Sequence, residues 1–136
     1  MTAKDYLNQG RWIDQRIESR IAERERLLDL VTSARAPQLS GMPRGGHHDW
    51  TDTVDAVVDM ADGIAEDIRR MMALKREIWA VIDAVEDFRY RAILEMRYRS
   101  NWRWETIADQ LHYDIRTVFR LHGEALRCVH VPQKMS

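Results

Sequence analysis

The sequence is poor in residues that interrupt helices, form disulfides or cross membranes. It has 3 prolines and 6 glycines among 136 residues, and its single cysteine, Cys128, has no partner for an internal disulfide. No apolar run approaches the roughly 20 residues of a membrane-spanning helix. The first residues lead into a mixed polar stretch, unlike the apolar core of a signal peptide. We therefore expect a cytoplasmic protein in a reducing compartment, without a membrane partner.

What the sequence has in abundance is helix-forming residues. Its two longest periodic stretches are rich in Ala, Leu, Ile, Met, Glu and Arg, which lose little conformational freedom in a helix. This composition predicts an all-α protein. The periodicity predicts a long two-helix coiled-coil N-terminal half, residues 1–87, followed by a small C-terminal helical domain, residues 88–130, and a tail, residues 131–136.

The apolar periodicity of the N-terminal half predicts two long helices, from about Lys4 to Ser33 and from about Thr51 to Ala84. In the second helix the apolar residues follow alternating steps of three and four, which is the heptad spacing of a coiled coil. At 1.5 Å per residue this helix is about 50 Å long, too long for burial in one small globule. The stripes are Ile13, Ile17, Ile21, Leu27, Leu28 and Val31 in the first helix, and Val54, Val57, Ala61, Ile64, Ile68, Met71, Lys75, Ile78, Ile82 and Val85 in the second.

Between these helices, at about residues 34–50, the periodicity fails. Two prolines and three glycines in this stretch predict a flexible linker. A heptad seam shows where helices meet but not whose helices they are. We favour an antiparallel pair within one chain, and a seam between two chains of a homodimer is the open alternative.

Charge is distributed unevenly along the chain, although the net charge is only -1. Residues 1–87 carry 12 Lys+Arg and 17 Asp+Glu, a balance of -5, whereas residues 88–136 carry 9 and 5, a balance of +4. Because phosphates attract clustered basic residues, a DNA-binding surface is expected in the C-terminal third.

The apolar periodicity of the C-terminal third predicts three helices. The first begins at Phe88 and closes near Arg99. A two-turn helix from Trp104 to Leu111 follows, and a three-residue turn, 112–114, separates it from a longer helix ending near Val129. A short helix, a tight turn and a longer helix is the spacing of a helix-turn-helix.

The apolar residues of these last two helices are spaced so that they can face each other and pack the two helices together at an angle. Asp114 is placed to cap the second helix, because its carboxylate can accept hydrogen bonds from unpaired N–H groups. Trp104 is expected in the core. The residues expected to face inward are Ile107, Ala108, Leu111, Val118 and Leu121.

The opposite face of the second helix supplies candidate DNA contacts. Arg116 and Arg120 are spaced i,i+4 and share this face, from which arginine can donate two parallel hydrogen bonds to guanine. Arg97, Arg99 and Arg103 precede the motif and are candidates for phosphate contacts. The alternative is a solvated basic face. The candidates on the second helix are Ile115, Arg116, Thr117, Phe119 and Arg120.

Residues 104–111, Asp114, residues 118–122 and residues 125–126 together form a string similar to the fourth conserved region of bacterial sigma factors. The string resembles more closely small phage and prophage regulators of the ArpU and RinA type. In that group a sigma-like C-terminal helix-turn-helix follows a helical N-terminal half. The resemblance implies a transcriptional role, activation of phage genes for packaging or morphogenesis, and RNA polymerase as a partner.

The sequence departs from that pattern at three residues. His112 stands where many helix-turn-helix turns carry glycine for a positive φ angle, which predicts a different or strained turn. Ile115 and Phe119 lie where promoter-reading sigma factors tend to have arginine, so the usual promoter element is not expected as the target. Nothing in the sequence matches the sigma regions that melt DNA or grip the polymerase core.

Chemical sites are sparse. His47-His48-Asp49 lacks the further ligands of a zinc site, and acidic i,i+4 pairs such as Asp62/Glu66 are typical of a solvated coiled-coil flank. No nucleophile triad, phosphate loop or dinucleotide fingerprint is found, so we expect neither an enzyme nor a cofactor.

Two alternatives stay open. A DNA-packaging adaptor of small-terminase type also combines a helix-turn-helix with helical oligomerisation elements, and a ring of eight or more chains in solution would favour it. A sigma-like protein that binds polymerase without DNA is the other.

Overall fold

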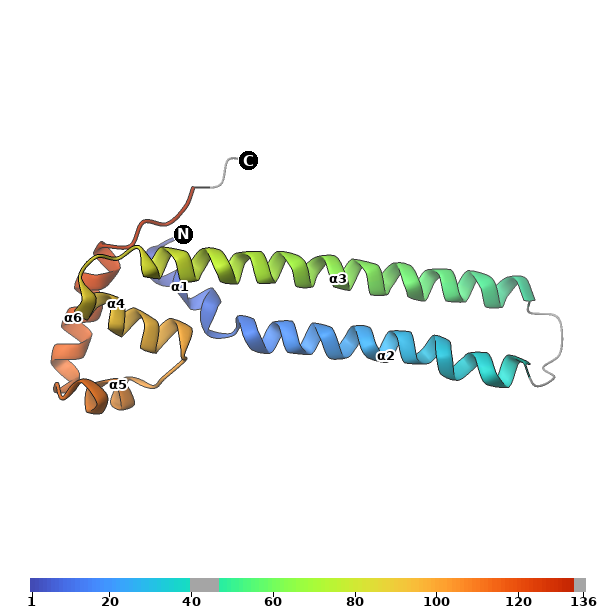
Figure 1. Ribbon diagram of the computed structural model, residues 1–136, viewed down its shortest axis with the longest axis horizontal. Helices are drawn as coiled ribbons and strands as arrows, with labels where there is room; N and C mark the ends of the chain where they lie inside the picture. Colours follow the sequence, from blue (N-terminus) through green and yellow to red (C-terminus); the bar gives the residue numbers. More distant parts are fainter. Residues whose placement is uncertain (40–46, 134–136) are drawn as a thin grey trace. The chain divides into compact units, whose positions relative to one another are not determined.

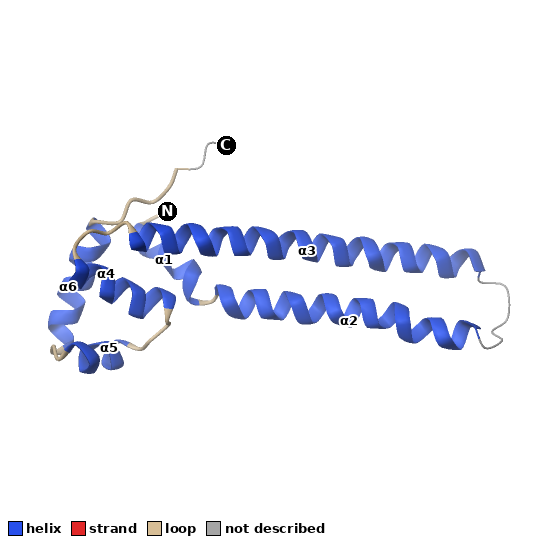
Figure 2. Cartoon of the chain, in the orientation of Figure 1, coloured by secondary structure: helices blue, strands red, loops and turns tan. Residues whose placement is uncertain are grey.

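The structure is a computed structural model that describes residues 1–39 and 47–133, without the side chains at 34–39 and 47–49. All regular secondary structure in these residues is helical, which confirms the predicted all-α class (Figures 1 and 2). None of these helices has the length and apolar character needed to span a membrane. The elements are α1 (Ala3–Arg11), α2 (Ile13–Leu39), α3 (His47–Asp83), α4 (Phe88–Leu94), the π-helical η2 (Glu95–Arg99), α5 (Trp104–Leu111) and α6 (Ile115–Arg127).

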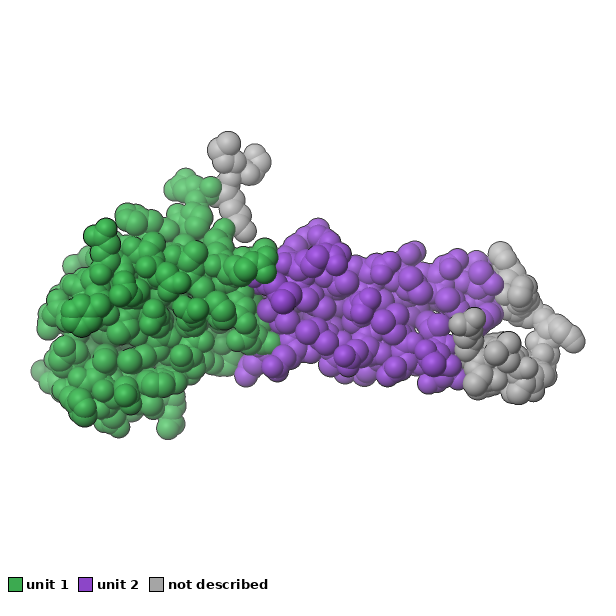
Figure 3. Space-filling view, viewed as in Figure 1, with its two compact units in different colours: residues 1–14, 73–136 green, residues 15–72 purple. Residues whose placement is uncertain are grey.

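The chain divides into two compact units, coloured separately in Figure 3. Unit 1 contains residues 1–14 and 73–136, and unit 2 contains residues 15–72. This division differs from the boundary expected at residues 87 and 88. The physical reason is that α1 and the last turns of α3 supply core residues to the unit that contains α4, α5 and α6.

Unit 2 is a pair of antiparallel helices, formed by the parts of α2 and α3 that it contains (Figure 1). Ala61 is fully buried, and Ile17, Ile64 and Met71 are nearly so. Of the predicted stripes, every residue in α3 and in the following Val85 is buried or half-buried. In α2, Ile21 is an exception, because it is 41% exposed. The two stripes of unit 2 therefore bury each other within one chain.

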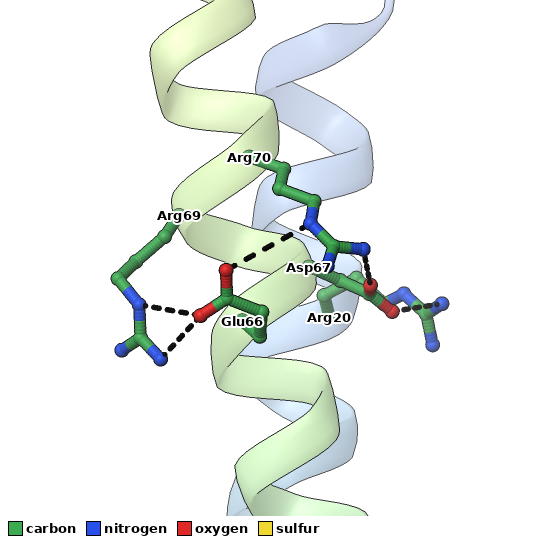
Figure 4. A network of polar contacts seen from close by, with 5 residues as sticks. All are labelled: Arg20, Glu66, Asp67, Arg69 and Arg70. Atoms are coloured by element: carbon green, nitrogen blue, oxygen red, sulfur yellow. Dashed lines mark hydrogen bonds and ion pairs between the residues drawn. The ribbon is translucent and has the colours of Figure 1, made fainter.

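Arginine side chains reach across this pair. Arg20 lies 3.0 Å from Asp67, and Arg24 donates a hydrogen bond of 3.3 Å to the Ala61 carbonyl oxygen. Figure 4 shows Arg20, Asp67 and the neighbouring Glu66 among the charged groups of one continuous network. Arg20 and Arg24 of α2 thus have partners on α3. Exposed pairs of this kind contribute little to stability.

The first helix is interrupted, whereas the sequence predicted a continuous helix from Lys4 to Ser33. Trp12 has φ -113° and ψ 2°, which ends α1, and α2 begins at Ile13. Gly10 explains how closely α1 approaches its neighbours. A Cβ at this position would lie 3.3 Å from Ile78 Cγ2 and 3.3 Å from the Tyr98 carbonyl oxygen. The break therefore lets α1 pack into unit 1.

The predicted linker at 34–50 was too wide, because α2 continues to Leu39 and α3 already begins at His47. Extending an existing helix adds a hydrogen bond for each residue fixed, so helices can continue beyond their last periodic apolar residue. Residues 40–46 of this predicted linker lie outside the described residues.

The core of unit 1 is assembled from segments far apart in the sequence. Its buried residues are Tyr6, Leu7, Ile78, Ile82, Val85, Leu94, Tyr98, Ala125 and Val129. Full burial of a Leu or Ile side chain contributes about 1.5–3 kcal/mol relative to exposure. A polar contact supports the same packing, since Arg11 Nε donates a hydrogen bond of 2.7 Å to Asn101 Oδ1. Residues from both ends of the chain thus share one core.

Candidate functional site

The packing of α5 against α6 follows the inward pattern expected from the sequence. Ile107 and Val118 are fully buried, and Ala108 belongs to the same small cluster. Leu121 is 2% exposed, while Leu111 and Trp104 are half-buried. These apolar contacts fix one face of α6 against the rest of unit 1, so its opposite face is free to project.

The turn between α5 and α6 places a non-glycine residue in the left-handed region. His112 has φ 59° and ψ 38°, and the Tyr113 amide donates a hydrogen bond of 3.1 Å to the Ala108 carbonyl oxygen. This closure is the one that glycine normally provides at helix ends. A side chain in this conformation costs about 1–2 kcal/mol. Of the two possibilities expected for His112, the structure therefore has the strained turn.

Asp114 caps α6 as the sequence predicted. Its carboxylate accepts a hydrogen bond of 2.8 Å from the Thr117 amide. Hydrogen bonding to Thr117 lowers the pKa of the Asp114 carboxyl below its usual value. The negative charge also lies at the helix end where the macrodipole favours it. The start of α6 is therefore well defined.

The exposed face of α6 carries four of the five candidate residues predicted on that helix. Ile115 is 37% exposed and Phe119 is 48% exposed. Arg116 is exposed and has no hydrogen bond or ion pair to any residue that the structure describes. Arg120 is exposed and lies 3.1 Å from Glu124. The fifth candidate, Thr117, is half-buried at the edge of this face.

Phe119 is supported from the side by an aromatic group. Its ring makes an edge contact with Trp104 of α5 at a centroid distance of 5.4 Å. Trp104 also packs edge-on against His122, at 4.6 Å. Aromatic pairs in this geometry are worth about 0.5–1.5 kcal/mol beyond their buried area. The exposed Phe119 ring is therefore held in place and does not project freely.

The three arginines that precede α5 have different surroundings. Arg97 donates a hydrogen bond of 2.9 Å to the Trp102 carbonyl oxygen and stacks over the Trp104 ring at 4.4 Å. Burial lowers the pKa of the Arg97 guanidinium below its usual value. Arg97 is thus engaged within unit 1.

Arg99 and Arg103 complete this group. Arg99 lies 3.3 Å from Asp83 and stacks over the Trp79 ring at 4.3 Å. Arg103 is exposed at the N-cap of α5 and has no partner among the described residues. The sequence could not reveal these internal contacts of Arg97 and Arg99, because they join residues through the tertiary packing. Of these three arginines, Arg103 is the one that is free to contact a ligand.

Two polar residues of α6 were missed as candidates. Glu124 accepts a hydrogen bond of 2.8 Å from the Tyr90 hydroxyl of α4, in addition to its contact with Arg120. This hydrogen bond is the largest cause that lowers the pKa of Glu124. The i,i+4 spacing from Arg120 was the available sequence signal, whereas the contribution of Tyr90 depends on the packing of α4.

His122 is the second missed residue. It is 7% exposed, and its Nε2 atom lies 2.6 Å from the Tyr98 hydroxyl. Burial lowers the pKa of His122 to about 4 and raises the pKa of Tyr98 to about 12. The imidazole is therefore neutral at physiological pH. Its place beside Leu121 in the inward stripe of α6 was the signal for burial.

Metal-binding side chains do not gather in the part of the chain that the structure describes, where no three His, Cys, Asp or Glu residues form a candidate metal site. The backbone of His47, His48 and Asp49 lies in α3, but the side chains of this stretch are outside the described ones. What the exposed face of α6 offers is two guanidinium groups beside two apolar side chains.

Comparison with known proteins identifies a family. A family model described as a protein of unknown function, DUF1492, matches residues 30–130. Because this match covers most of the 136 residues, the chain belongs to that family. No curated protein and no solved structure matches the chain. The family description names no activity, so the resemblance to ArpU and RinA regulators stays a prediction.

Proposed function

We propose that this member of the DUF1492 family is a sequence-specific DNA-binding transcription regulator of the phage and prophage type. In this proposal α5, the turn at 112–114 and α6 act as a helix-turn-helix, and α6 enters the major groove. The resemblance to ArpU and RinA regulators supports the phage context and the choice of activation. The physical case depends on α6.

The observation that carries the proposal is the two-sided character of α6. Its inner face is buried through Val118, Leu121 and Ala125, while Arg116 and Arg120 are exposed one helical turn apart on the outer face. A major groove admits one α-helix, and a helix that enters it must present donors and apolar groups on the side facing the bases. The outer face of α6 has both kinds of group.

The four exposed residues of this face match chemical groups of DNA. The guanidinium of Arg116 or Arg120 can donate two hydrogen bonds to guanine O6 and N7. Ile115 and Phe119 match the thymine methyl group, which is apolar. Arg103 at the start of α5 is suited to a phosphate contact, because the first helix of such a motif crosses the DNA backbone.

Unit 2 has a separate role in this proposal. Its paired helices are buried against each other, and they also leave Leu30 and Met60 more than half exposed. We propose that this coiled coil recruits a partner, either a second copy in a homodimer or RNA polymerase. Double-stranded DNA is the partner of unit 1.

The test is selection of bound duplexes from a random DNA pool, followed by affinity measurements on the selected duplex and a scrambled one. Arg120→Ala is expected to lower the ratio of the two affinities about tenfold or more, since a bidentate arginine–guanine pair is worth about 1–3 kcal/mol of discrimination. Arg127→Ala is a matched control, because Arg127 is an exposed arginine in the last turn of α6. It is expected to leave the ratio unchanged.

Two outcomes would contradict the proposal. Selection that yields no enriched sequence would refute sequence-specific binding, provided that binding is measured at low salt, where phosphate contacts are strongest. Equal loss of affinity for both duplexes in Arg120→Ala would reduce Arg120 to a phosphate contact.

A further inference from the structure

Arg120 and Arg116 differ in a way that their shared face does not explain. Arg116 has no partner among the described residues, whereas Arg120 Nη1 donates a hydrogen bond of 3.1 Å to Glu124 Oε1. A carboxylate on a surface that binds phosphates reduces the attraction for any DNA sequence. Glu124 therefore lowers the affinity of this surface for DNA, so a role other than affinity has to account for a carboxylate at this position.

The Glu124 carboxylate is held from two sides. Its Oε2 atom accepts a hydrogen bond of 2.8 Å from the Tyr90 hydroxyl, which belongs to α4, and its Oε1 atom accepts the bond from Arg120. The Glu124 side chain is 33% exposed, while that of Arg120 is 63% exposed. An exposed i,i+4 pair on a helix is normally mobile and weak. In this pair the hydrogen bond from Tyr90, on a second helix, restrains the Glu124 carboxylate.

The geometry of the guanidinium shows what the pair can do. Arginine has five N–H donors in a planar fork. The contact with Glu124 uses Nη1, which leaves the edge formed by Nε and Nη2 free for two parallel hydrogen bonds. Guanine O6 and N7 are the two acceptors that match such an edge. Arg120 is therefore oriented before DNA arrives and keeps one complete recognition edge.

We propose that Glu124 is a specificity-determining residue of this surface, which positions Arg120 for a base edge and weakens its attraction to phosphates. This inference rests on the proposed function of α6 as a DNA-reading helix. In it, Tyr90 is a positioning residue that acts through Glu124, and Arg103 supplies a contact that does not depend on sequence. Pre-orientation lowers the entropy lost on binding the correct base.

The test compares the wild type with Glu124→Gln and Tyr90→Phe in the full chain, on the selected and the scrambled duplex over a range of salt concentrations. Glu124→Gln frees Arg120 for a phosphate, so the affinity for scrambled duplex is expected to rise and the ratio of the two affinities to fall about tenfold. The logarithmic salt slope should become steeper by about 0.9, the value for one additional phosphate contact.

Tyr90→Phe separates positioning from charge. It keeps both charged groups but removes the hydroxyl that anchors Glu124, so the ratio is expected to fall about threefold with no change in salt slope. Glu86→Gln is the charge-matched control, because Glu86 is exposed and has no partner among the described residues. It should change both affinities equally. Thermal unfolding by circular dichroism verifies that each variant is folded.

The possible failures are distinguishable. A wild type without preference for any duplex refutes the proposed function and this inference with it. A wild type with clear preference, together with ratios within twofold of it in both Glu124→Gln and Tyr90→Phe, refutes the inference alone. A steeper salt slope in Glu124→Gln without loss of the ratio also refutes it, since Glu124 then acts only as a charge.

Discussion

His122 is a buried histidine on a helix whose outer face is basic. Its ring packs between Trp104 and Tyr98, and it shares a hydrogen bond with the Tyr98 hydroxyl. A neutral imidazole satisfies this hydroxyl without placing a charge in the core. A protonated imidazole would be a buried cation, and the positive charges of Lys4 and Arg97 also lower the pKa of His122. Neutral His122 is therefore part of what keeps α6 in place.

This residue predicts a pH dependence of stability. Folding lowers the pKa of His122 from 6.5 to about 4, so the unfolded chain binds the proton first. Its contribution is fully present above pH 6.5 and is lost as the pH falls toward 4. Between pH 7 and pH 5 the free energy of unfolding is expected to fall by about 2 kcal/mol from this group.

Urea unfolding at a series of pH values measures this loss, and His122→Gln is the control. Glutamine keeps a hydrogen-bonding group near Tyr98 but does not titrate. The variant should therefore lose about 2 kcal/mol less than the wild type between pH 7 and pH 5. Parallel pH profiles of the two proteins would show that folding does not lower the pKa of His122, contrary to this expectation.

The helices differ in whether their bounds are set by residues close in the sequence or by contacts with distant residues. The bounds of α5 and the first residue of α6 agree with the sequence prediction, because Asp114 is a local cap and Leu111 ends the apolar period. The break at Trp12 and the inclusion of α1 in unit 1 were not predicted. They depend on the close approach of Gly10 to Ile78, which lies far away in the sequence.

The packing of α1 leads to a prediction at this scale. Leu7 is fully buried, and Leu7→Ala is expected to lower the free energy of unfolding by about 3 kcal/mol, because it leaves a cavity in the core. Leu30→Ala is the matched control, since Leu30 is 59% exposed, and it should cost less than about 0.5 kcal/mol. Urea unfolding followed by circular dichroism compares the two. Similar losses in both variants would contradict the placement of α1 in the core.

At the scale of the whole molecule, unit 1 is formed by two separate stretches of chain, and unit 2 is the stretch between them. The two connection points are close together, because Asp14 and Lys75 form an ion pair within unit 1. Unit 1 also has its own core, which includes Leu7, Ile78 and Leu94. We therefore regard unit 1 as capable of folding without unit 2.

Replacement of residues 15–72 by a short Gly/Ser connector tests this independence. The shortened chain is expected to unfold cooperatively, to keep the near-ultraviolet circular dichroism of packed aromatic rings, and to be monomeric by mass in solution. Removal of unit 2 also removes the surface proposed for partners. A chain with helical far-ultraviolet signal but no cooperative transition would show that unit 1 depends on unit 2.

The sequence by itself determined the all-α class, the α3 stripe, the inward stripe of α6 and the cap at Asp114, because these depend on local spacing. The tertiary structure alone decided that α1 joins unit 1, that Arg97 and Arg99 are engaged internally, and that Tyr90 anchors Glu124. Each of these joins residues through packing, and the spacing of residues along one helix has no information about which distant side chain meets it. The exposed face of α6 and the i,i+4 spacing of Arg120 and Glu124 could thus be read from the sequence, whereas the hydrogen bond from Tyr90 to Glu124 required the packing of α4.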